Sequence, residues 1–343
     1  MLSNWIPPMR RDTNIDAFRV LLVFFVCIMH SIYVGAQRGV GCAWLSNLVE
    51  WSVPGFIVIS GWYGINFSFA KVIKLYAVSL YCAIVVVSLD TWLRGGELGL
   101  CTIRTIWRTA IGYWFVNSYV VLMMLAPLVN TAFTAIRELD SLKKKKVLIT
   151  ICLPIFVLVE VWAFSATLPG LGLIVPHYSG IAKSSFGTLL ALYVLTRAVR
   201  LALQDEKMSK ALRRVPCWLW LIAVILATVM ASLGMGDING PFAFIIALTM
   251  FAIFNRLRLP ILIGKTFGLL APSVFSIYLF HTNEIAWSYM RTLLMHIINA
   301  CDNRFIAYVI VAFVALMLGL VLDIPRRAVK FLMVIRSRSN LSE

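Results

Sequence analysis

Ten stretches of about 20 largely apolar residues follow one another along this sequence, and this is the length that an α-helix needs to cross the hydrocarbon core of a bilayer. The breaks between them are short, and are polar or contain proline and glycine. We therefore predict an all-α, polytopic membrane protein without a soluble domain, which forms one domain over residues 1–343. A cytoplasmic segment 1–14 precedes the first span and a cytoplasmic tail 326–343 follows the last. The predicted spans are 15–35, 44–67, 71–93, 112–136, 147–166, 180–200, 217–235, 240–257, 264–287 and 304–325.

The charged residues indicate how the spans are oriented. Charged side chains make up only 13% of the chain, yet 31 Lys and Arg stand against 15 Asp and Glu. In a soluble protein this excess would suggest a nucleic-acid partner. Here 24 of the 31 cations, including the run Lys143 to Lys146, fall on one side of the predicted spans, together with both termini. Cytoplasmic loops carry such an excess, so we expect cytoplasmic termini in an inner membrane, contact with membrane lipids and no nucleic-acid partner.

Several familiar site patterns are missing from the sequence. The seven cysteines contain no C-x-x-C pair, which excludes the usual zinc spacings. Neither a dinucleotide-binding fingerprint, a Walker loop nor an H-E-x-x-H motif occurs. We therefore expect no metal.

The first predicted span carries three ionisable residues, Asp16, Arg19 and His30. Charged and titratable groups inside spans are costly and often functional. Eleven residues are about three helical turns, which places Arg19 and His30 on one face roughly 16 Å apart. Asp16 lies three residues before Arg19 and can orient or neutralise it. A structural alternative is that Arg19 reaches the cytoplasmic headgroups and His30 bonds a neighbouring helix.

Other ionisable residues follow the same polarity along the predicted bundle. Lys71 and Lys74 fall with Arg19 at the cytoplasmic end, whereas acids and imidazoles fall in the middle or outer half of their spans. This second group is His30, Asp90, Glu160, His281 and Glu284. The gradient suits a large anion that enters from the cytoplasm and proton transfer nearer the other face, because histidine titrates near physiological pH. Two alternatives remain. One is that the lysines simply follow the excess of positive charge on the cytoplasmic side of membrane proteins, and the other is that the acids form hydrogen bonds between helices.

Aromatic and amide residues begin the fourth predicted span. Trp114, Phe115, Asn117 and Tyr119 follow one another within six positions. Such a cluster forms either an aromatic belt at the membrane surface or a rim that stacks on sugars.

Five motifs in the expected order make the chain resemble the acyltransferase-3 superfamily of integral-membrane acyltransferases. The first is an Arg, ten residues and a His, here Arg19 and His30. The others are Phe56 to Gly61, the basic pair Lys71 and Lys74, the segment with Trp114, Phe115, Tyr119, Pro127 and Leu128, and Ile277 to His281. Any one motif is weak, but five in order are specific.

The resemblance implies a ten-helix bundle that moves an acyl group, commonly acetyl from acetyl-CoA, to a hydroxyl of a glycan or glycolipid beyond the membrane. Arg19 and His30 are then the essential pair, with Arg19, Lys71 and Lys74 at the donor phosphates. Lys71 and Lys74 occupy positions at which the family often has arginines. The ammonium group of a lysine is a point charge, whereas the guanidinium group of an arginine can donate to two oxygens at once.

On this interpretation His30 is the general base or, alternatively, carries the acyl group. His281 or Glu160 orients it, and Tyr278, Ser60 or Asn117 donates to the oxyanion. The predicted acceptor-binding residues are Trp114, Asn117, Tyr119 and Tyr278. A homodimer is also compatible with the sequence.

Two other classes of function compete with the enzyme. A transporter or flippase for an anionic lipid or glycan needs the same polar path, although no internal repeat of the transporter kind is visible. A catalytically silent membrane sensor is the third possibility, against which Arg19 and His30 argue.

Overall fold

The computed structural model describes residues 12–97, 99–165, 186–205, 210, 214–230, 241–257, 259–301 and 303–339. These residues form helices and connecting turns, with no strand in the described part of the chain. The all-α prediction is therefore confirmed there. The helices of the first half are α1 Thr13–Ala36, α2 Ala43–Val49, α3 Ser52–Tyr63, α4 Phe69–Leu93, α5 Leu100–Ile111, α6 Trp114–Glu138 and α7 Ser141–Ser165. Those of the second half are α8 Phe186–Ala202, α10 Cys217–Met230, α11 Pro241–Phe254, α12 Ile261–Leu270, η4 Ala271–Ser273, α13 Val274–His281, α14 Glu284–Cys301 and α15 Arg304–Ser339.

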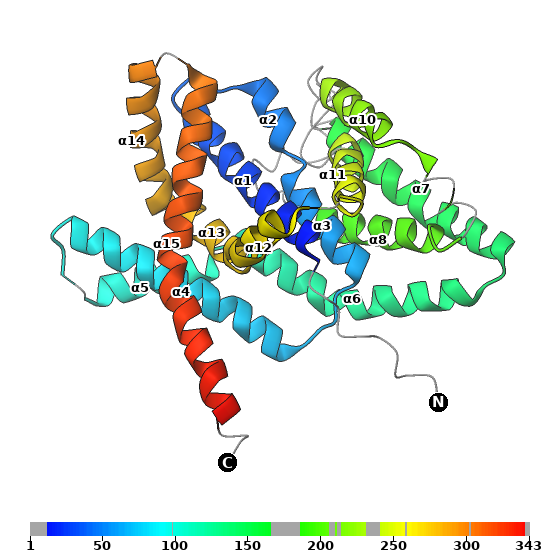
Figure 1. Cartoon of the computed structure of the whole chain (residues 1–343), viewed down its shortest axis with the longest axis horizontal. Coiled ribbons are helices and arrows are strands. Elements are labelled where there is room, and N and C mark those ends of the chain that lie inside the picture. The colour runs from blue at the N-terminus through cyan, green and yellow to red at the C-terminus, as the bar shows by residue number, and fades with distance from the viewer. Residues whose placement is uncertain are drawn as a thin grey trace.

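Helix α1 lies at the centre of the bundle. It contacts α3 and α11 on one side and α12, α13, α14 and α15 on the other, which Figure 1 shows as two groups of helices around the dark blue element. Its apolar residues are buried, for example Phe18, Leu22 and Cys27, each fully buried. The first predicted span therefore agrees with α1 to within two residues at each end.

Five described helices or helical runs are long and apolar enough to cross a membrane. Many of their large apolar side chains face outward, such as Leu128 at 69% and Phe313 at 51% exposure, as expected for a surface in contact with lipid rather than water. The runs are Thr13–Ala36, Phe69–Leu93, Trp114–Glu138, Ile261–His281 and Arg304–Met333. Helices α10 and α11 are apolar but shorter. The chain is thus a helical membrane protein, and the count of ten spans stays a prediction.

Three predicted spans differ from the observed helices. The last, 304–325, continues as α15 to Ser339, so residues 326–339 are helical where a tail was predicted. The span 44–67 is divided into α2 and α3 by a turn at Glu50 and Trp51, where the Trp51 indole donates to the Leu48 carbonyl at 2.8 Å. The span 264–287 is divided into α12, η4 and α13, since Pro272 lacks the N–H that a continuous helix needs. Helix α14 then follows as an amphipathic helix whose polar residues keep its mean hydropathy low.

Two glycines in α3 and just after it have a packing reason. A Cβ at Gly55 would lie 2.5 Å from Leu22 Cδ2, so glycine allows α3 to approach α1 closely. Gly64 ends α3 at a φ of 83°, which glycine adopts without strain. The chain that follows is held by Tyr193, whose hydroxyl accepts from the Ile65 N–H at 3.0 Å and donates to Asn130. Close packing thus explains Gly55, and the end of α3 at Gly64 forms part of one wall of a cavity.

Candidate active site

Two histidines from distant parts of the sequence meet in the interior. His30 lies on α1 and His281 ends α13, and both side chains are buried. The Nδ1 atom of His30 is 3.0 Å from Nε2 of His281, and Nδ1 of His281 is 2.7 Å from the Ile277 carbonyl oxygen. Of the two residues predicted to orient His30, His281 and Glu160, His281 is therefore placed in contact with it.

The hydrogen bonds of this pair assign its protons. A carbonyl oxygen only accepts, so Nδ1 of His281 must carry the hydrogen and Nε2 of the neutral ring must accept. Nδ1 of His30 then donates to His281, and Nε2 of the neutral His30 ring carries a lone pair. No described residue bonds that Nε2 atom. The pair thus presents one basic nitrogen for a substrate proton.

Aromatic side chains surround the pair. The ring of His30 has its centroid 6.4 Å from that of Tyr33 and 5.8 Å from that of Trp287. The indole Nε1–H of Trp287 is buried and has no acceptor among the described residues. Such an unpaired buried donor is costly, which makes it a candidate for binding a ligand oxygen. Asn283 fixes the start of the helix that carries Trp287, because its Oδ1 accepts from the Ala286 N–H at 2.8 Å.

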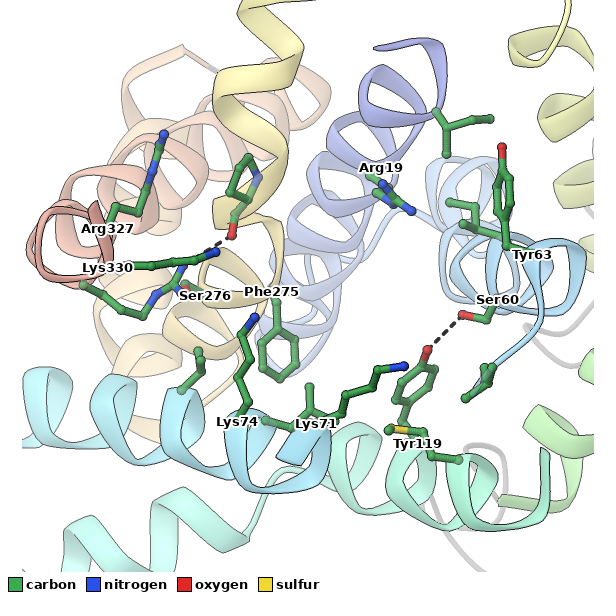
Figure 2. A pocket seen from close by; sticks show the side chains of 18 of the residues that line it. Arg19, Ser60, Tyr63, Lys71, Lys74, Tyr119, Phe275, Ser276, Arg327 and Lys330 are labelled. Carbon is green, nitrogen blue, oxygen red and sulfur yellow. Dashed lines mark hydrogen bonds between the residues drawn. The ribbon is translucent and has the colours of Figure 1, made fainter. Parts of the chain in front are cut away.

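A cavity of about 1370 Å³ lies near the N-terminal end of α1. It is lined by residues of α1, α3, α4, α6, α13 and α15, which Figure 2 shows around a common space. Its lining contains one carboxylate, Asp12, and six cationic side chains. These cations are Arg19, Lys71, Lys74, Arg326, Arg327 and Lys330.

Two of the six cations have acidic partners nearby. Arg19 Nη1 lies 3.0 Å from the Asp16 carboxylate, which is fully buried, so Asp16 orients Arg19 as expected. Arg326 makes two contacts with Asp323, at 2.6 and 2.8 Å.

The remaining cations keep their charge available. Lys71 Nζ donates to the Asn66 carbonyl at 2.9 Å, and Lys74 and Lys330 bond no described residue. The cavity therefore carries an excess of positive charge and suits a ligand with several anionic groups.

A row of ring contacts connects the cavity with the histidine pair. Tyr119 lines the cavity, and its hydroxyl is 3.1 Å from Ser60 Oγ, as drawn in Figure 2. Phe115 stacks on Tyr119 at 5.8 Å and meets Tyr278 at 5.5 Å, while Tyr278 lies 6.2 Å from His281. This series of rings provides an apolar surface between the two polar regions.

The other predicted residues occupy different surroundings. Trp114 packs edge-on against Phe115 at 5.6 Å and is 38% exposed. The Asn117 amide donates to the Ile111 carbonyl and accepts from the Tyr76 hydroxyl, both at 2.9 Å, so protein groups occupy both ends of it. Glu160 falls on α7, but its side chain lies outside the described residues. No group of three potential metal ligands occurs in the described part.

Four residues of these sites were not predicted as site residues. Trp287 ends the predicted span 264–287, a position at which a tryptophan is usually part of an aromatic belt. Arg326, Arg327 and Lys330 were assigned to a tail, but α15 continues through Pro325 to Ser339 and brings them to the cavity. The spacing of three residues between Arg327 and Lys330, typical of one helix face, is the signal that was available.

A comparison with protein families places these residues in context. A family model described as an acyltransferase domain matches residues 12–324, which confirms the resemblance based on the five motifs. The curated proteins and the solved structures that were compared gave no match. The matched region contains both histidines and ends before Arg326.

Proposed function

The chain belongs to the acyltransferase-3 family, and from this premise we propose that it transfers an acetyl group from cytoplasmic acetyl-CoA to a hydroxyl of an extracytoplasmic glycan or glycolipid. The observation that carries the proposal is the placement of a cation-lined cavity and a buried histidine pair at two levels of one continuous helix, α1. A membrane acyltransferase needs both, because the donor is a polyanion and the reaction moves a proton. The proposed location is the inner membrane with cytoplasmic termini.

The donor fits the cavity by charge and by length. Coenzyme A carries a diphosphate and a separate phosphomonoester, and Arg19, Lys71 and Lys74 offer charge-assisted hydrogen bonds to such groups. Arg19 and His30 are eleven residues apart on an unbroken helix, which corresponds to roughly 16 Å. An extended pantetheine arm covers a distance of this order, and the rings of Tyr119, Phe115 and Tyr278 would contact its apolar segments. The thioester would thus reach the level of the histidines.

His30 acts as the general base in the proposed reaction. Nε2 of His30 takes the proton of the acceptor hydroxyl while the hydroxyl oxygen attacks the thioester carbonyl carbon. His281 accepts the Nδ1–H hydrogen bond throughout and stabilises the imidazolium that forms. The tetrahedral intermediate collapses with cleavage of the carbon–sulfur bond, and the proton on His30 passes to the thiolate. The products are an acetyl ester and CoA with a free thiol.

The negative oxygen of that intermediate needs a hydrogen-bond donor. The indole ring of Trp287 packs against His30 at a centroid distance of 5.8 Å, and its Nε1–H has no partner in the described part of the chain, so it is the donor that we assign. Ser60 lies in the cavity instead, and the Asn117 amide is bonded to protein groups. Tyr278 lies next to His281 and would shape the path of the arm.

We expect His281 to act by positioning His30. Replacing His281 with Phe removes the acceptor for Nδ1–H and is expected to lower kcat about 10- to 100-fold, as loss of such orienting bonds does elsewhere. His281→Gln keeps an amide oxygen as acceptor and should retain more activity. Steady-state transfer rates of both variants test this. An equal decrease of kcat in His281→Phe and His281→Gln would contradict a hydrogen-bonding role for His281.

A transporter for an anionic glycan or lipid is the second candidate, because a positively charged cavity in a helical membrane bundle would also serve transport. Purified protein in liposomes, supplied with acetyl-labelled acetyl-CoA and a panel of glycans, separates the two. We expect free CoA thiol to appear in step with label in one acceptor. Movement of a glycan across the bilayer without thiol release would favour the transporter and overturn the proposed enzyme.

A further inference from the structure

The last helix extends beyond the residues that the family model matches. The family match ends at residue 324, whereas α15 continues to Ser339. Just before this extension, Tyr81 donates to the Leu322 carbonyl at 2.7 Å. Arg326 then donates to the Pro272 carbonyl at 3.3 Å, and Arg327 Nη1 lies 3.5 Å from Ser273 Oγ. The first turn of the extension is therefore held against η4 and forms a wall of the cavity.

This wall carries charge that the protein does not neutralise. Asp323 pairs with Arg326, but Arg327 and Lys330 have no carboxylate partner in the described part of the chain. Lys71 and Lys74 stand on the α4 wall of the same cavity, as Figure 2 shows. Like charges that line one space repel each other, so the arrangement favours a ligand with anionic groups at two separate positions.

The position of the rings of Tyr119, Phe115 and Tyr278 indicates which phosphate group of CoA would lie near α4 and which near α15. The pantetheine arm is attached to the diphosphate of CoA, and the row of rings begins at Tyr119. Lys71 reaches toward Tyr119 in Figure 2, whereas Arg327 and Lys330 lie on the opposite side of the space. The diphosphate, from which the arm starts, therefore belongs near Lys71. The phosphate on the ribose, which is farther from the arm, belongs at α15.

We propose that Arg327 and Lys330 bind the ribose 3′-phosphate of the donor and make this enzyme select CoA thioesters over donors that lack that phosphate. The inference rests on the proposed acetyl-CoA-dependent function and adds a specificity site outside the family-matched region. Arginine and lysine both bind phosphate by charge-assisted hydrogen bonds. The gain in binding is confined to donors that carry the 3′-phosphate.

The test compares acetyl-CoA with acetyl-3′-dephospho-CoA as donors for the full chain in liposomes. The intact protein is expected to show a kcat/KM at least about 30-fold higher for acetyl-CoA, the range of one or two charge-assisted bonds. The double variant Arg327→Gln/Lys330→Gln is expected to reduce this preference to less than about threefold. In this double variant kcat/KM should fall for acetyl-CoA and stay unchanged for acetyl-3′-dephospho-CoA. Glutamine is a good helix former, so α15 should persist.

Two further variants serve as controls. Lys145→Gln/Lys146→Gln makes the same change of charge at exposed positions on α7 outside the cavity lining, and should keep the full preference. Lys71→Gln/Lys74→Gln should lower kcat/KM for both donors alike, because both carry the diphosphate. Thermal unfolding of each purified variant shows whether it is folded like the intact protein.

Two results would overturn the inference while leaving the proposed function in place. One is an intact protein that uses both donors equally well. The other is a folded Arg327→Gln/Lys330→Gln variant that loses activity equally with both donors, since these side chains would then act on the diphosphate. Failure of the intact protein to transfer from either donor to any acceptor would instead overturn the proposed function, and the inference with it.

Discussion

Replacement of His30 with Ala is expected to lower kcat for acyl transfer about 10³-fold, within the range that general bases contribute. His30 presents the lone pair of Nε2 because its Nδ1–H is committed to His281 at 3.0 Å. Alanine provides no base, and the hydroxyl would have to lose its proton to water. The KM for acetyl-CoA should stay within about threefold of the intact value, because Arg19, the residue proposed to bind the donor phosphates, lies roughly 16 Å from His30 along α1.

Transfer of acetyl label at saturating donor measures this effect. His296→Ala is the matched control, since His296 is an exposed histidine on α14 outside the cavity lining, and its removal should leave the rate unchanged. If a folded His30→Ala variant transfers as fast as the intact protein, His30 has a structural role and the base lies elsewhere. Accumulation of acetyl label on the intact protein, absent from His30→Ala, would identify His30 as an acyl carrier instead.

Replacement of Trp287 with Phe is expected to lower kcat about 10²-fold, as the loss of one oxyanion donor does in other enzymes. Phenylalanine keeps much of the aromatic packing against His30, whose ring centroid lies 5.8 Å from that of Trp287, but lacks the Nε1–H. Because that N–H has no acceptor among the described residues, its removal leaves no protein group unpaired. Stability should therefore be nearly unchanged.

The ratio of kinetic constants separates this role from a packing role. A donor used only in the transition state lowers kcat and kcat/KM by the same factor. A Trp287→Phe variant with normal kcat would show that the indole N–H is not used in catalysis. Trp218→Phe on α10 is a suitable control, since Trp218 is 58% exposed and lies outside the cavity lining.

The candidate residues could be predicted from the sequence largely because ionisable groups are rare in apolar spans. Arg19, His30 and His281 stood out on this ground, and periodicity alone placed Arg19 and His30 on one face of a helix that the structure shows unbroken. The choice between His281 and Glu160 as the partner of His30 could not be made from the sequence, because 251 residues separate His30 from His281 and only the packing of α1 against α13 joins them.

The elements that were missed have a common physical reason. Mean hydropathy detects helices that are apolar all round, and α14 is amphipathic, so only its first turn, with Trp287, fell inside a predicted span. Mean hydropathy also placed the end of the last predicted span just before Arg326 and Arg327. A helix continues as readily with arginine as with leucine, and α15 does so. The distinction between a charged tail and a charged helix depends on the contacts with η4, which a sequence does not show.

The most direct test of the account is the sidedness of transfer in sealed proteoliposomes of known orientation. Acetyl-CoA does not cross the bilayer, so donor and acceptor can be supplied on chosen sides. We predict transfer when acetyl-CoA is on the side of the termini and the acceptor is on the opposite side, with loss of transfer in His30→Ala. Transfer that requires donor and acceptor on the same side would contradict an acyl path along α1 from the cationic cavity to the histidine pair.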